Sequence, residues 1–361
     1  MTAHTRCQPL LDVLRNPARM AALDLGAWDR LLRQAGAAGL LSRIAVQAEA
    51  LGLDAALPDP VRPHLTAART VATKQRQAVR WETRRVARAL AGVEGPILLL
   101  KGAAYALADL PPAAGRLFGD IDLLAPRAQL GRVEGDLMLA GWHAGGKSEY
   151  DQRYYRRWMH ELPPMIHLRR GTVLDVHHNL LPETARIRTR AEPLLADARP
   201  LPGFPGLHIP RDTDLVLHSA CHLFHEGEWG HGLRDLVDLD AMLRAFPAEP
   251  SFWSGLLARA AALNLGRPLY YALDCCRRWL RTPVPERVIA ACPSQPPAWQ
   301  RPLMRWLFDA GLASAHATCR KPWSGPALFL LFVRSHYLRM PWRLLLPHLL
   351  HQATTRDRQQ D

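Results

Sequence analysis

Residues 97–124 read ILLLKGAAYALADLPPAAGRLFGDIDLL, and this stretch organises the rest of the chain. A short apolar run after a Gly-Pro pair predicts a strand that is buried on both faces. Lys101 and Gly102 come next, followed by a short helix and a second strand that contains Asp120 and Asp122. Side chains two positions apart in a strand point to the same face, so the two carboxylates should lie side by side.

This acidic pair predicts a metal site. Adjacent carboxylates repel each other unless a cation lies between them, and Mg²⁺ prefers oxygen ligands and often arrives with substrate phosphates. The sequence GTVLDVH at 171–177 predicts a later strand in which Asp175 and His177 share one face. Sheet pairing would bring Asp175 beside Asp120 and Asp122. An Asp-x-Asp pair is also a frequent chance match on a surface strand, but a third aspartate on a later strand favours a metal site.

The order of these features resembles the core of the nucleotidyltransferases of the DNA polymerase β-like superfamily. The matching features are LKG at 100–102, the short helix, Arg116 and DIDLL at 120–124. Within that superfamily, the chain is similar to an uncharacterised bacterial nucleotidyltransferase family that has LKG where other members have Gly-Ser. The resemblance extends to VLDVHHNLL at 173–181 and to LVLHSACHLF and LRDLVDLDAML within 215–243.

The resemblance implies a metal-dependent enzyme that moves an NMP from an NTP to an acceptor hydroxyl, with pyrophosphate leaving. Asp120, Asp122 and Asp175 are the expected catalytic residues and the expected ligands of Mg²⁺ or Mn²⁺, and Asp175 would also accept the hydroxyl proton. The turn of Lys101 and Gly102 would hold the β and γ phosphates, because a helix N-terminus favours anions. The preferred base and the acceptor (a small molecule, a protein or RNA) do not follow from the sequence.

The resemblance also carries expectations about context and accessory residues. It implies a bacterial cytoplasmic enzyme, often met beside polysaccharide-export or exosortase genes. Arg116 would steer the triphosphate, or alternatively would pair with the acidic cluster and keep it ionised. His177 would orient Asp175 or pack in the site. Ala103 has no hydroxyl where the superfamily has serine, and this alters the expected contacts with phosphate.

A later segment adds candidates from the helical region. Arg234 and Asp235 lie in a segment that resembles the family's pattern, and with Asp238 we expect an Arg–Asp network that joins the helical domain to the catalytic sheet. Contact with the nucleotide base is the alternative. Four histidines lie nearby: His218, His222, His225 and His231. Apart from Glu226 or Glu228, no cysteine or acidic residue completes a recognisable zinc set with them, so we expect them to line the cleft instead.

The predicted fold is α+β, with a small mixed β-sheet nucleotidyltransferase core flanked by N-terminal and C-terminal helical regions. The expected regions are 1–95 (helical), 96–205 (catalytic core) and 206–361 (C-terminal helical domain). The active cleft should lie between the sheet and the C-terminal helices. Residues 182–210 are rich in Pro and Arg and predict a linker or an irregular excursion.

Two predictions concern individual helices. Residues 63–91 predict a long Arg-rich helix with a solvated basic face, or with a basic face that closes over nucleotide phosphates. Its expected buried stripe is Val71, Val79, Trp81, Val86 and Leu90. Asp212 or Thr213 is the expected N-cap of a helix that runs to about residue 224.

The composition bears on partners. A formal net charge of +13 and a pI near 10.1 are compatible with an acidic partner such as nucleic acid, nucleotide or anionic lipid. Nearly all the basic residues are Arg, and Ala and Pro are plentiful, a pattern that a GC-rich genome produces without selection for binding. Two alternative functions stay open: an RNA-modifying or toxin-like transferase that uses the Arg-rich helix and the loop at 150–158, and a non-catalytic nucleotide-binding relative.

Other features predict location. Six scattered cysteines without a CxxC pair predict reduced thiols in a cytoplasm. From the lack of an apolar stretch near Met1 we expect no signal peptide, and no run comes near the roughly 18 apolar residues of a membrane span. For the tail at 326–352 we favour buried closing helices over peripheral contact with an anionic membrane, because Pro341 and Pro347 interrupt any long amphipathic face.

Overall fold

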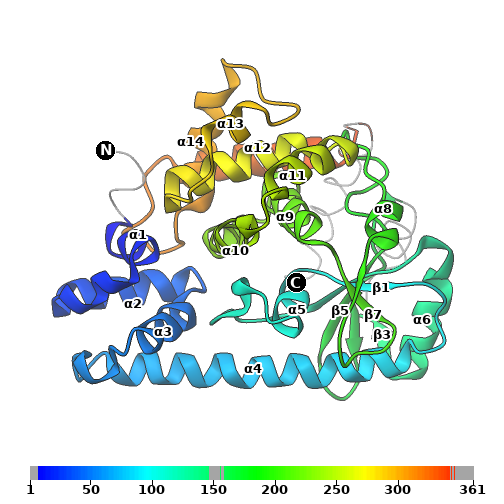
Figure 1. Ribbon diagram of the computed structural model, residues 1–361, viewed down its shortest axis with the longest axis horizontal. Coiled ribbons are helices and arrows are strands. Elements are labelled where there is room, and N and C mark those ends of the chain that lie inside the picture. Colours follow the sequence, from blue (N-terminus) through cyan, green and yellow to red (C-terminus); the bar gives the residue numbers. More distant parts are fainter. Residues whose placement is uncertain (1–6, 146–154, 156–157, 342, 344, 346–361) are drawn as a thin grey trace, which may run out of the picture.

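The computed structural model of the protein describes residues 7–145, 155, 158–341, 343 and 345. Most of the loop predicted at 150–158 and the end of the tail lie outside the described residues. The described chain forms a seven-stranded mixed sheet with helices from both ends of the sequence packed around it (Figure 1). The α+β prediction is therefore confirmed.

The sheet has the strand order β3-β4-β5-β2-β1-β7-β6. Its strands are β1 Ile97–Leu99, β2 Ile121–Leu124, β3 Trp142–Ala144, β4 Met165–His167, β5 Val173–His177, β6 Arg199–Pro200 and β7 Leu207–Ile209. Strand β2 is antiparallel to β1 and parallel to β5, and β1 is parallel to β7. Strands β1 and β2 are buried along their whole length, as the apolar run at the start of the 97–124 stretch predicts.

Residues 182–210 were predicted to be a linker or an irregular excursion, and the linker is wrong because two short strands of this mostly irregular segment join the sheet. Strands β6 and β7 form an antiparallel pair, and Leu207 of β7 lies opposite Ile97 of β1. A short helix, α8 Glu192–Ala196, precedes them. Strands of two or three residues beside prolines and glycines carry too little periodicity to be recognised, and pairing with β1 makes this segment extended.

The N-terminal region is helical, as predicted. Its helices are α1 Gln8–Arg15, α2 Leu25–Ala37, α3 Leu41–Ala50 and α4 Arg62–Ala89. Figure 1 shows α4 running along one side of the molecule, from α3 at one end to the sheet at the other.

The predicted stripe on α4 is right at Val79, Val86 and Leu90, which are buried, and wrong at Val71 and Trp81, which are exposed. The buried face instead includes Ala68, Ala72, Glu82 and Thr83. An ion pair to Arg170 beside the sheet lets the acidic Glu82 occupy a core position.

The C-terminal region is also helical. Its helices are α9 Asp212–Cys221, α10 Gly232–Ala245, α11 Phe252–Ala262, α12 Gly266–Cys275, α13 Glu286–Ala290, α14 Gln300–Leu312 and α15 Ser324–Arg339. Helix α9 continues into a π-helical turn at His222–Glu226, and α12 continues into one at Cys276–Leu280. These helices cover one end of the sheet and face the N-terminal helices (Figure 1).

Two helix ends show how local sequence acts. Helix α6, Leu130–Leu139, ends before Gly141, whose φ of +100° is a left-handed conformation that favours glycine. The N-cap of α9 is Arg211, so the prediction of Asp212 or Thr213 is wrong. Asp212 is already helical, and its side chain accepts a hydrogen bond from Arg199 at 2.5 Å. That contact with β6 takes the carboxylate away from the helix end.

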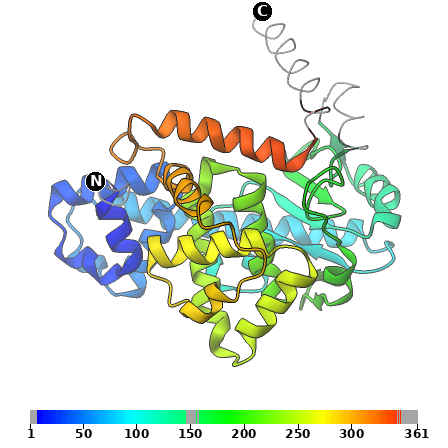
Figure 2. The ribbon, with the colours of Figure 1, turned by 90° about the horizontal axis from the view of Figure 1, so that it is seen from above.

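Helix α15 lies along the outside of the molecule, against α14 (Figure 2). Ala327, Leu331 and Ser335 are buried on its inner face, as predicted for a closing helix. Its outer face exposes large apolar side chains: Phe329, Leu330, Phe332, Val333 and Tyr337. The prediction of a buried helix is therefore right for one face only. Among the described residues, no helix is both long enough and apolar enough to cross a bilayer.

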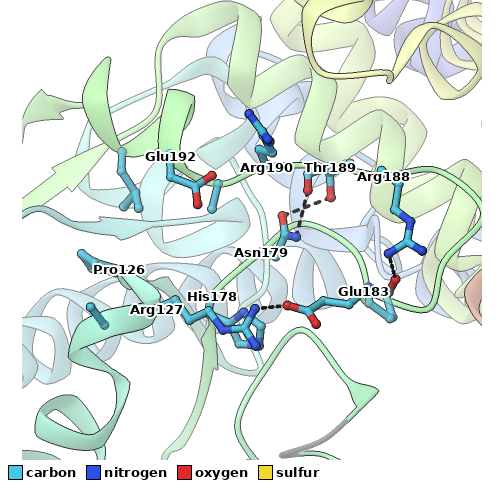
Figure 3. A pocket seen from close by; sticks show the side chains of 13 residues that line it. Pro126, Arg127, His178, Asn179, Glu183, Arg188, Thr189, Arg190 and Glu192 are labelled. Atoms are coloured by element: carbon cyan, nitrogen blue, oxygen red, sulfur yellow. Dashed lines mark hydrogen bonds and ion pairs between the residues drawn. The ribbon is translucent and has the colours of Figure 1, made fainter.

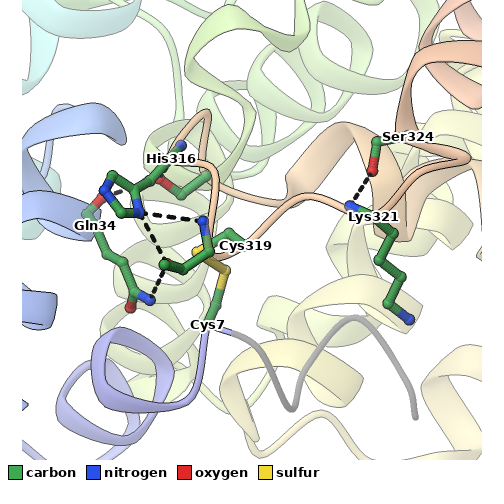
Figure 4. Close-up of a disulfide and its surroundings, with 8 residues drawn as sticks. Cys7, Gln34, His316, Cys319, Lys321 and Ser324 are labelled. Carbon is green, nitrogen blue, oxygen red and sulfur yellow. Dashed lines mark hydrogen bonds between the residues drawn. A yellow bond between two sulfur atoms is a disulfide. The ribbon is translucent and has the colours of Figure 1, made fainter.

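A disulfide joins the two ends of the fold. Cys7, directly before α1, is bonded to Cys319, in the loop before α15, with their Cα atoms 4.9 Å apart (Figure 4). Next to it, Gln34 Nε2 donates a hydrogen bond to Thr318 Oγ1 at 2.9 Å. The prediction of reduced thiols is wrong for this pair, because 312 residues separate the partners and no local spacing signals them. Four cysteines are free and buried: Cys221, Cys275, Cys276 and Cys292.

Candidate active site

A cavity of about 210 Å³ lies between the sheet and the C-terminal helices, where the sequence predicted the cleft. Helix α5, Lys101–Leu107, forms one wall, the start of β2 contributes a second, and α9 and α10 form the opposite side. Figure 1 shows α5 between the sheet and α10. Most of the lining residues are charged: Lys101, Arg116, Asp120, Asp122, Glu228, Arg234, Asp235 and Asp238. Such a lining suits a charged ligand better than an apolar one.

The sheet brings the three predicted aspartates together. Strands β2 and β5 are parallel, and Asp122 lies directly opposite Asp175 in their register. Asp120 immediately precedes β2, two positions from Asp122, and so lies on the same side of the strand. One carboxylate oxygen from each aspartate lies within 4.8 Å of the other two. Three acids from two distant segments therefore form one cluster.

Asp122 is the most enclosed of the three and is held by basic groups. Its side chain is 4% exposed, and its Oδ1 accepts hydrogen bonds from Lys101 Nζ at 2.9 Å and from His177 Nε2 at 3.2 Å. The other ring nitrogen of His177, Nδ1, lies 3.3 Å from Glu161 Oε2. The sequence suggested that His177 orients Asp175 or packs in the site; the structure places it in the site, against Asp122. The register explains this, because His177 is the diagonal neighbour of Asp122 across the two strands.

Electrostatics distinguish the three carboxylates. Burial opposes ionisation of Asp122, but the charge of Lys101 and the hydrogen bond from His177 hold its pKa well below its usual range. Loss of hydration and the charge of Asp122 raise the pKa of Asp120. Burial and the charges of Asp122 and Glu161 raise the pKa of Asp175 to about 7. Asp122 is thus firmly ionised, and its negative charge opposes the ionisation of Asp120 and Asp175.

The cluster fits a divalent cation. Asp175 Oδ1 is buried and has no hydrogen-bond partner among the residues that the structure describes. All three donor groups are carboxylates, the ligands that Mg²⁺ and Mn²⁺ prefer. A cation among them would satisfy the orphaned oxygen and remove the mutual repulsion. Asp120, Asp122 and Asp175 are therefore the residues that could hold a metal.

Replacing Asp175 with asparagine is expected to stabilise the metal-free protein, increasingly so as the pH rises from 4 to 8. The folded-state pKa of about 7 lies above the ordinary value of 3.8, so ionisation destabilises the folded state as the pH rises through this window. We expect the variant to gain about 2 kcal/mol in free energy of unfolding at pH 8 and little at pH 4. The gain at pH 8 is smaller than the full pKa shift implies, because the carboxylate keeps some contact with solvent. Urea unfolding in the presence of a chelator measures both values. A difference that does not change with pH would contradict this account.

The turn between β1 and α5 has an unusual backbone. Lys101 adopts a φ of +43°, which is rare for a residue with a side chain and costs free energy. Gly102 is buried, and a Cβ there would collide with the guanidinium of Arg116 and lie 3.0 Å from Phe118 Cδ1. A side chain at position 102 would therefore displace the Arg116 guanidinium, whatever the contact of Gly102 with phosphate. The strained turn aims the Lys101 ammonium at Asp122 and into the cavity.

Arg116 binds helix α10 and makes no hydrogen bond to the acidic cluster on β2 among the described residues. Its Nε donates to Asp238 Oδ2 at 2.6 Å, and its Nη2 lies 3.9 Å from Asp235 Oδ1. Asp238 also accepts a hydrogen bond from Arg43 Nη2 of α3 at 2.9 Å. The expected Arg–Asp network is therefore present, and it joins α3, α10 and the segment before β2. Arg234 contacts Asp235 at 3.0 Å and lines the cavity beside this network.

Several polar groups near the aspartates carried no signal in the sequence. They are Tyr105, His160, Glu161 and Ser219. Glu226 accepts a hydrogen bond from His222 Nδ1 at 2.7 Å and lies 3.7 Å from His160 Nε2. Of the four histidines first considered for zinc, His222 and His231 line the cavity. Within the described ranges, no cluster of metal-ligating groups includes any of those four.

A larger cavity, of about 790 Å³, lies at the other end of β2 and β5 (Figure 3). Pro126 and His178, which follow those strands, form part of its wall. Arg127 and Arg188 line it and both bind Glu183. A four-residue strand spans about 13 Å, so this cavity is well separated from Asp120 at the start of β2. Its lining contains no member of the metal-ligating clusters in the described chain, and the smaller cavity is therefore the candidate active site.

Comparison with known proteins agrees with this geometry. A family model with the description "Uncharacterised nucleotidyltransferase" matches residues 25–281. The matched span includes all three aspartates, the β1–α5 turn and the α10 network. Neither curated proteins nor solved structures give a match.

Proposed function

Because the chain belongs to the uncharacterised nucleotidyltransferase family, we propose that it transfers an NMP from an NTP to an acceptor hydroxyl, with Mg²⁺ or Mn²⁺ bound by Asp120, Asp122 and Asp175. The observation that carries this proposal is the cluster of three carboxylates beside the β1–α5 turn. Asp175 Oδ1 lacks a hydrogen-bond partner in the described chain, and burial together with the neighbouring carboxylates raises the pKa of Asp175. Both facts are expected of a site built to receive a cation.

The residues of the site have distinct roles in this reaction. The metal supplies charge neutralisation on the phosphates and lowers the pKa of the attacking hydroxyl. Lys101 and His177 fix the orientation of Asp122 and keep it ionised before substrate arrives. Asp175 accepts the proton of the acceptor hydroxyl. A bond forms between the acceptor oxygen and the α-phosphorus, the bond from the α-phosphorus to the oxygen bridging to the β-phosphate breaks, and pyrophosphate leaves.

The nucleotide contacts that we propose are those of the cavity wall. Lys101 and Gly102 lie at the β1–α5 turn, next to the aspartates, and both line the cavity. Arg116 lines it too, and its bond to Asp238 holds the guanidinium in one orientation. These groups would bind the triphosphate. Arg234 and Asp235, on the opposite side of the cavity, would contact the nucleoside end.

Transfer of radiolabel tests the proposal and identifies the acceptor. The purified protein is incubated with each α-labelled NTP, Mg²⁺ or Mn²⁺, and cell extract, and label is then measured in the protein, RNA and small-molecule fractions. We expect label to move with the wild type and not with Asp122→Ala. Equal transfer by the wild type and Asp122→Ala would overturn the mechanism.

The same experiment separates the alternatives. Label that appears in RNA, with binding that weakens steeply as salt is raised, would identify an RNA-modifying enzyme. NTP binding without transfer in any fraction would identify a non-catalytic relative. Label that appears in the protein or small-molecule fraction would show that the acceptor belongs to that class.

A further inference from the structure

Behind Asp122 lies a second group of side chains with the geometry of a metal site. It consists of His160, Glu161 and His177, and one potential ligand atom from each lies within 4.8 Å of the other two. His160 is 4% exposed and His177 is 6% exposed, whereas the Glu161 side chain is 19% exposed. The group shares no member with the three aspartates. It is linked to them by the contact of His177 with Asp122 and by the charge of Glu161, which acts on Asp175.

Backbone pairing holds this group in place. Glu161 forms an antiparallel bridge with His177, and Leu162 N donates to Val176 O at 2.8 Å. Directly opposed residues in an antiparallel pair project to the same face. On the preceding residue, the carbonyl oxygen of His160 accepts from His178 N at 2.8 Å. The three side chains are therefore fixed by the end of β5 and the segment that pairs with it.

Each imidazole has one nitrogen facing a carboxylate outside the group. His177 Nε2 donates its hydrogen to Asp122. The other ring nitrogen, Nδ1, lies 3.3 Å from Glu161 Oε2, and a metal could bind it in place of a proton. His160 Nε2 lies 3.7 Å from Glu226 Oε1. Metal-binding histidines are commonly held in this way, with the second ring nitrogen turned to a carboxylate that fixes the tautomer.

The remaining nitrogen of His160 has no partner. His160 Nδ1 is buried without a hydrogen bond among the described residues. An unsatisfied polar atom in the interior is costly, and a bound cation would remove that cost.

From these contacts we propose that His160, Glu161 and His177 bind a zinc ion, with water as the fourth ligand. Two ligand atoms at about 2.0–2.1 Å from a tetrahedral zinc lie about 3.3 Å apart, which is the separation of His177 Nδ1 and Glu161 Oε2. Two imidazoles and one carboxylate select zinc over Mg²⁺, which prefers oxygen ligands only. The partly exposed Glu161 provides the side from which water and metal enter.

The proposed zinc links to the site of the three aspartates through one side chain. A metal on Nδ1 of His177 requires the proton on Nε2, and that is the proton donated to Asp122 Oδ1. Zinc would thereby lock the orientation of Asp122. The proposal is independent of nucleotidyl transfer, because it rests on a separate set of ligands and is tested without nucleotide.

Metal analysis of the tag-free full-length protein tests this site. The protein is stripped with a chelator, titrated with Zn²⁺ against a chromophoric competitor, and analysed for bound metal. We expect one zinc per chain in the wild type, and affinity at least about 100-fold lower in His160→Gln and Glu161→Gln. Substitution with Co²⁺ should give the visible absorption of a four-coordinate site in the wild type and lose it in both variants.

Two controls separate this site from other zinc binding. His225→Gln removes a histidine that is equally buried and also lacks partners in the described chain, but belongs to no cluster, so its zinc affinity should match the wild type. Asp120→Asn disables the aspartate cluster and should likewise retain the zinc. If His160→Gln does not fold, as judged by circular dichroism, the partly exposed Glu161→Gln decides. Absence of stoichiometric zinc in the wild type, or equal affinity in wild type and Glu161→Gln, would overturn the proposal and reduce the group to a hydrogen-bonded His–Glu pair.

Discussion

Asp120→Asn is expected to lower nucleotidyl transfer at least about 10³-fold, equivalent to about 4 kcal/mol of transition-state stabilisation, while the protein stays folded. Asp120 is exposed, and apart from a hydrogen bond to its own backbone its side chain has no hydrogen bond or ion pair among the described residues, so little structural contact is lost. Removing its charge also relieves repulsion with Asp122 and Asp175 in the metal-free protein. We therefore expect a melting temperature in chelator equal to or above that of the wild type. Label transfer and thermal unfolding, measured on the same preparation, check the two halves of this result.

A matched control addresses the effect of removing any carboxylate. The side chain of Asp59 is 92% exposed and contacts only Arg62, at 3.3 Å, in the described chain. Asp59→Asn should leave both transfer and Mn²⁺ affinity unchanged, whereas Asp120→Asn should lose both. Wild-type levels of transfer by Asp120→Asn would remove this aspartate from the metal site. A parallel loss of melting temperature would instead show that its role is structural.

Asp238→Asn is expected to destabilise the folded protein by about 3–5 kcal/mol, the usual cost of leaving buried charges without their partner. The Asp238 side chain is 3% exposed and lies between Arg43 at 2.9 Å and Arg116 at 2.6 Å, both of them largely buried. Without the carboxylate, two guanidinium groups would face each other in the interior. The free energy of unfolding in urea, at constant pH and salt, measures the loss.

Two further variants test whether charge is the cause. Asp235→Asn removes a neighbouring carboxylate that lies 3.9 Å from Arg116 and accepts a hydrogen bond from the partly exposed Arg234 at 3.0 Å. It should cost less than Asp238→Asn, because Arg116 keeps its closer partner, Asp238. Adding Arg43→Met to Asp238→Asn removes one of the unpaired charges and should recover part of the stability. A double variant less stable than Asp238→Asn alone would indicate that lost packing, not unpaired charge, dominates.

The sequence predicted those parts of the site that lie within one or two elements. The stretch at 97–124 encodes a strand, turn, helix and strand in unbroken order, so local periodicity was sufficient. Asp175 was found because alternation in GTVLDVH assigned it a face, and the parallel register of β2 and β5 then placed it opposite Asp122. In both cases a period of two and an apolar flank determine where the carboxylate points.

Contacts between distant segments could not be predicted in this way. Arg43 lies 195 residues from Asp238, and nothing near either residue indicates the other. Glu161 and His160 precede β5 in a segment without periodicity, and only its pairing with β5 brings them to Asp122. Strands β6 and β7 likewise depend on the edge of β1. Each of these features is fixed by tertiary packing, which overrides local preference.

The bond between Cys7 and Cys319 makes a covalent ring of most of the chain. All of the span that matches the family model, residues 25–281, lies inside this ring. One proteolytic cut at a loop within the ring would leave two pieces that are still tethered, at an effective concentration far above that of separate fragments. Under oxidising conditions, a nicked molecule could therefore keep its aspartates assembled, and only reduction would let the pieces part.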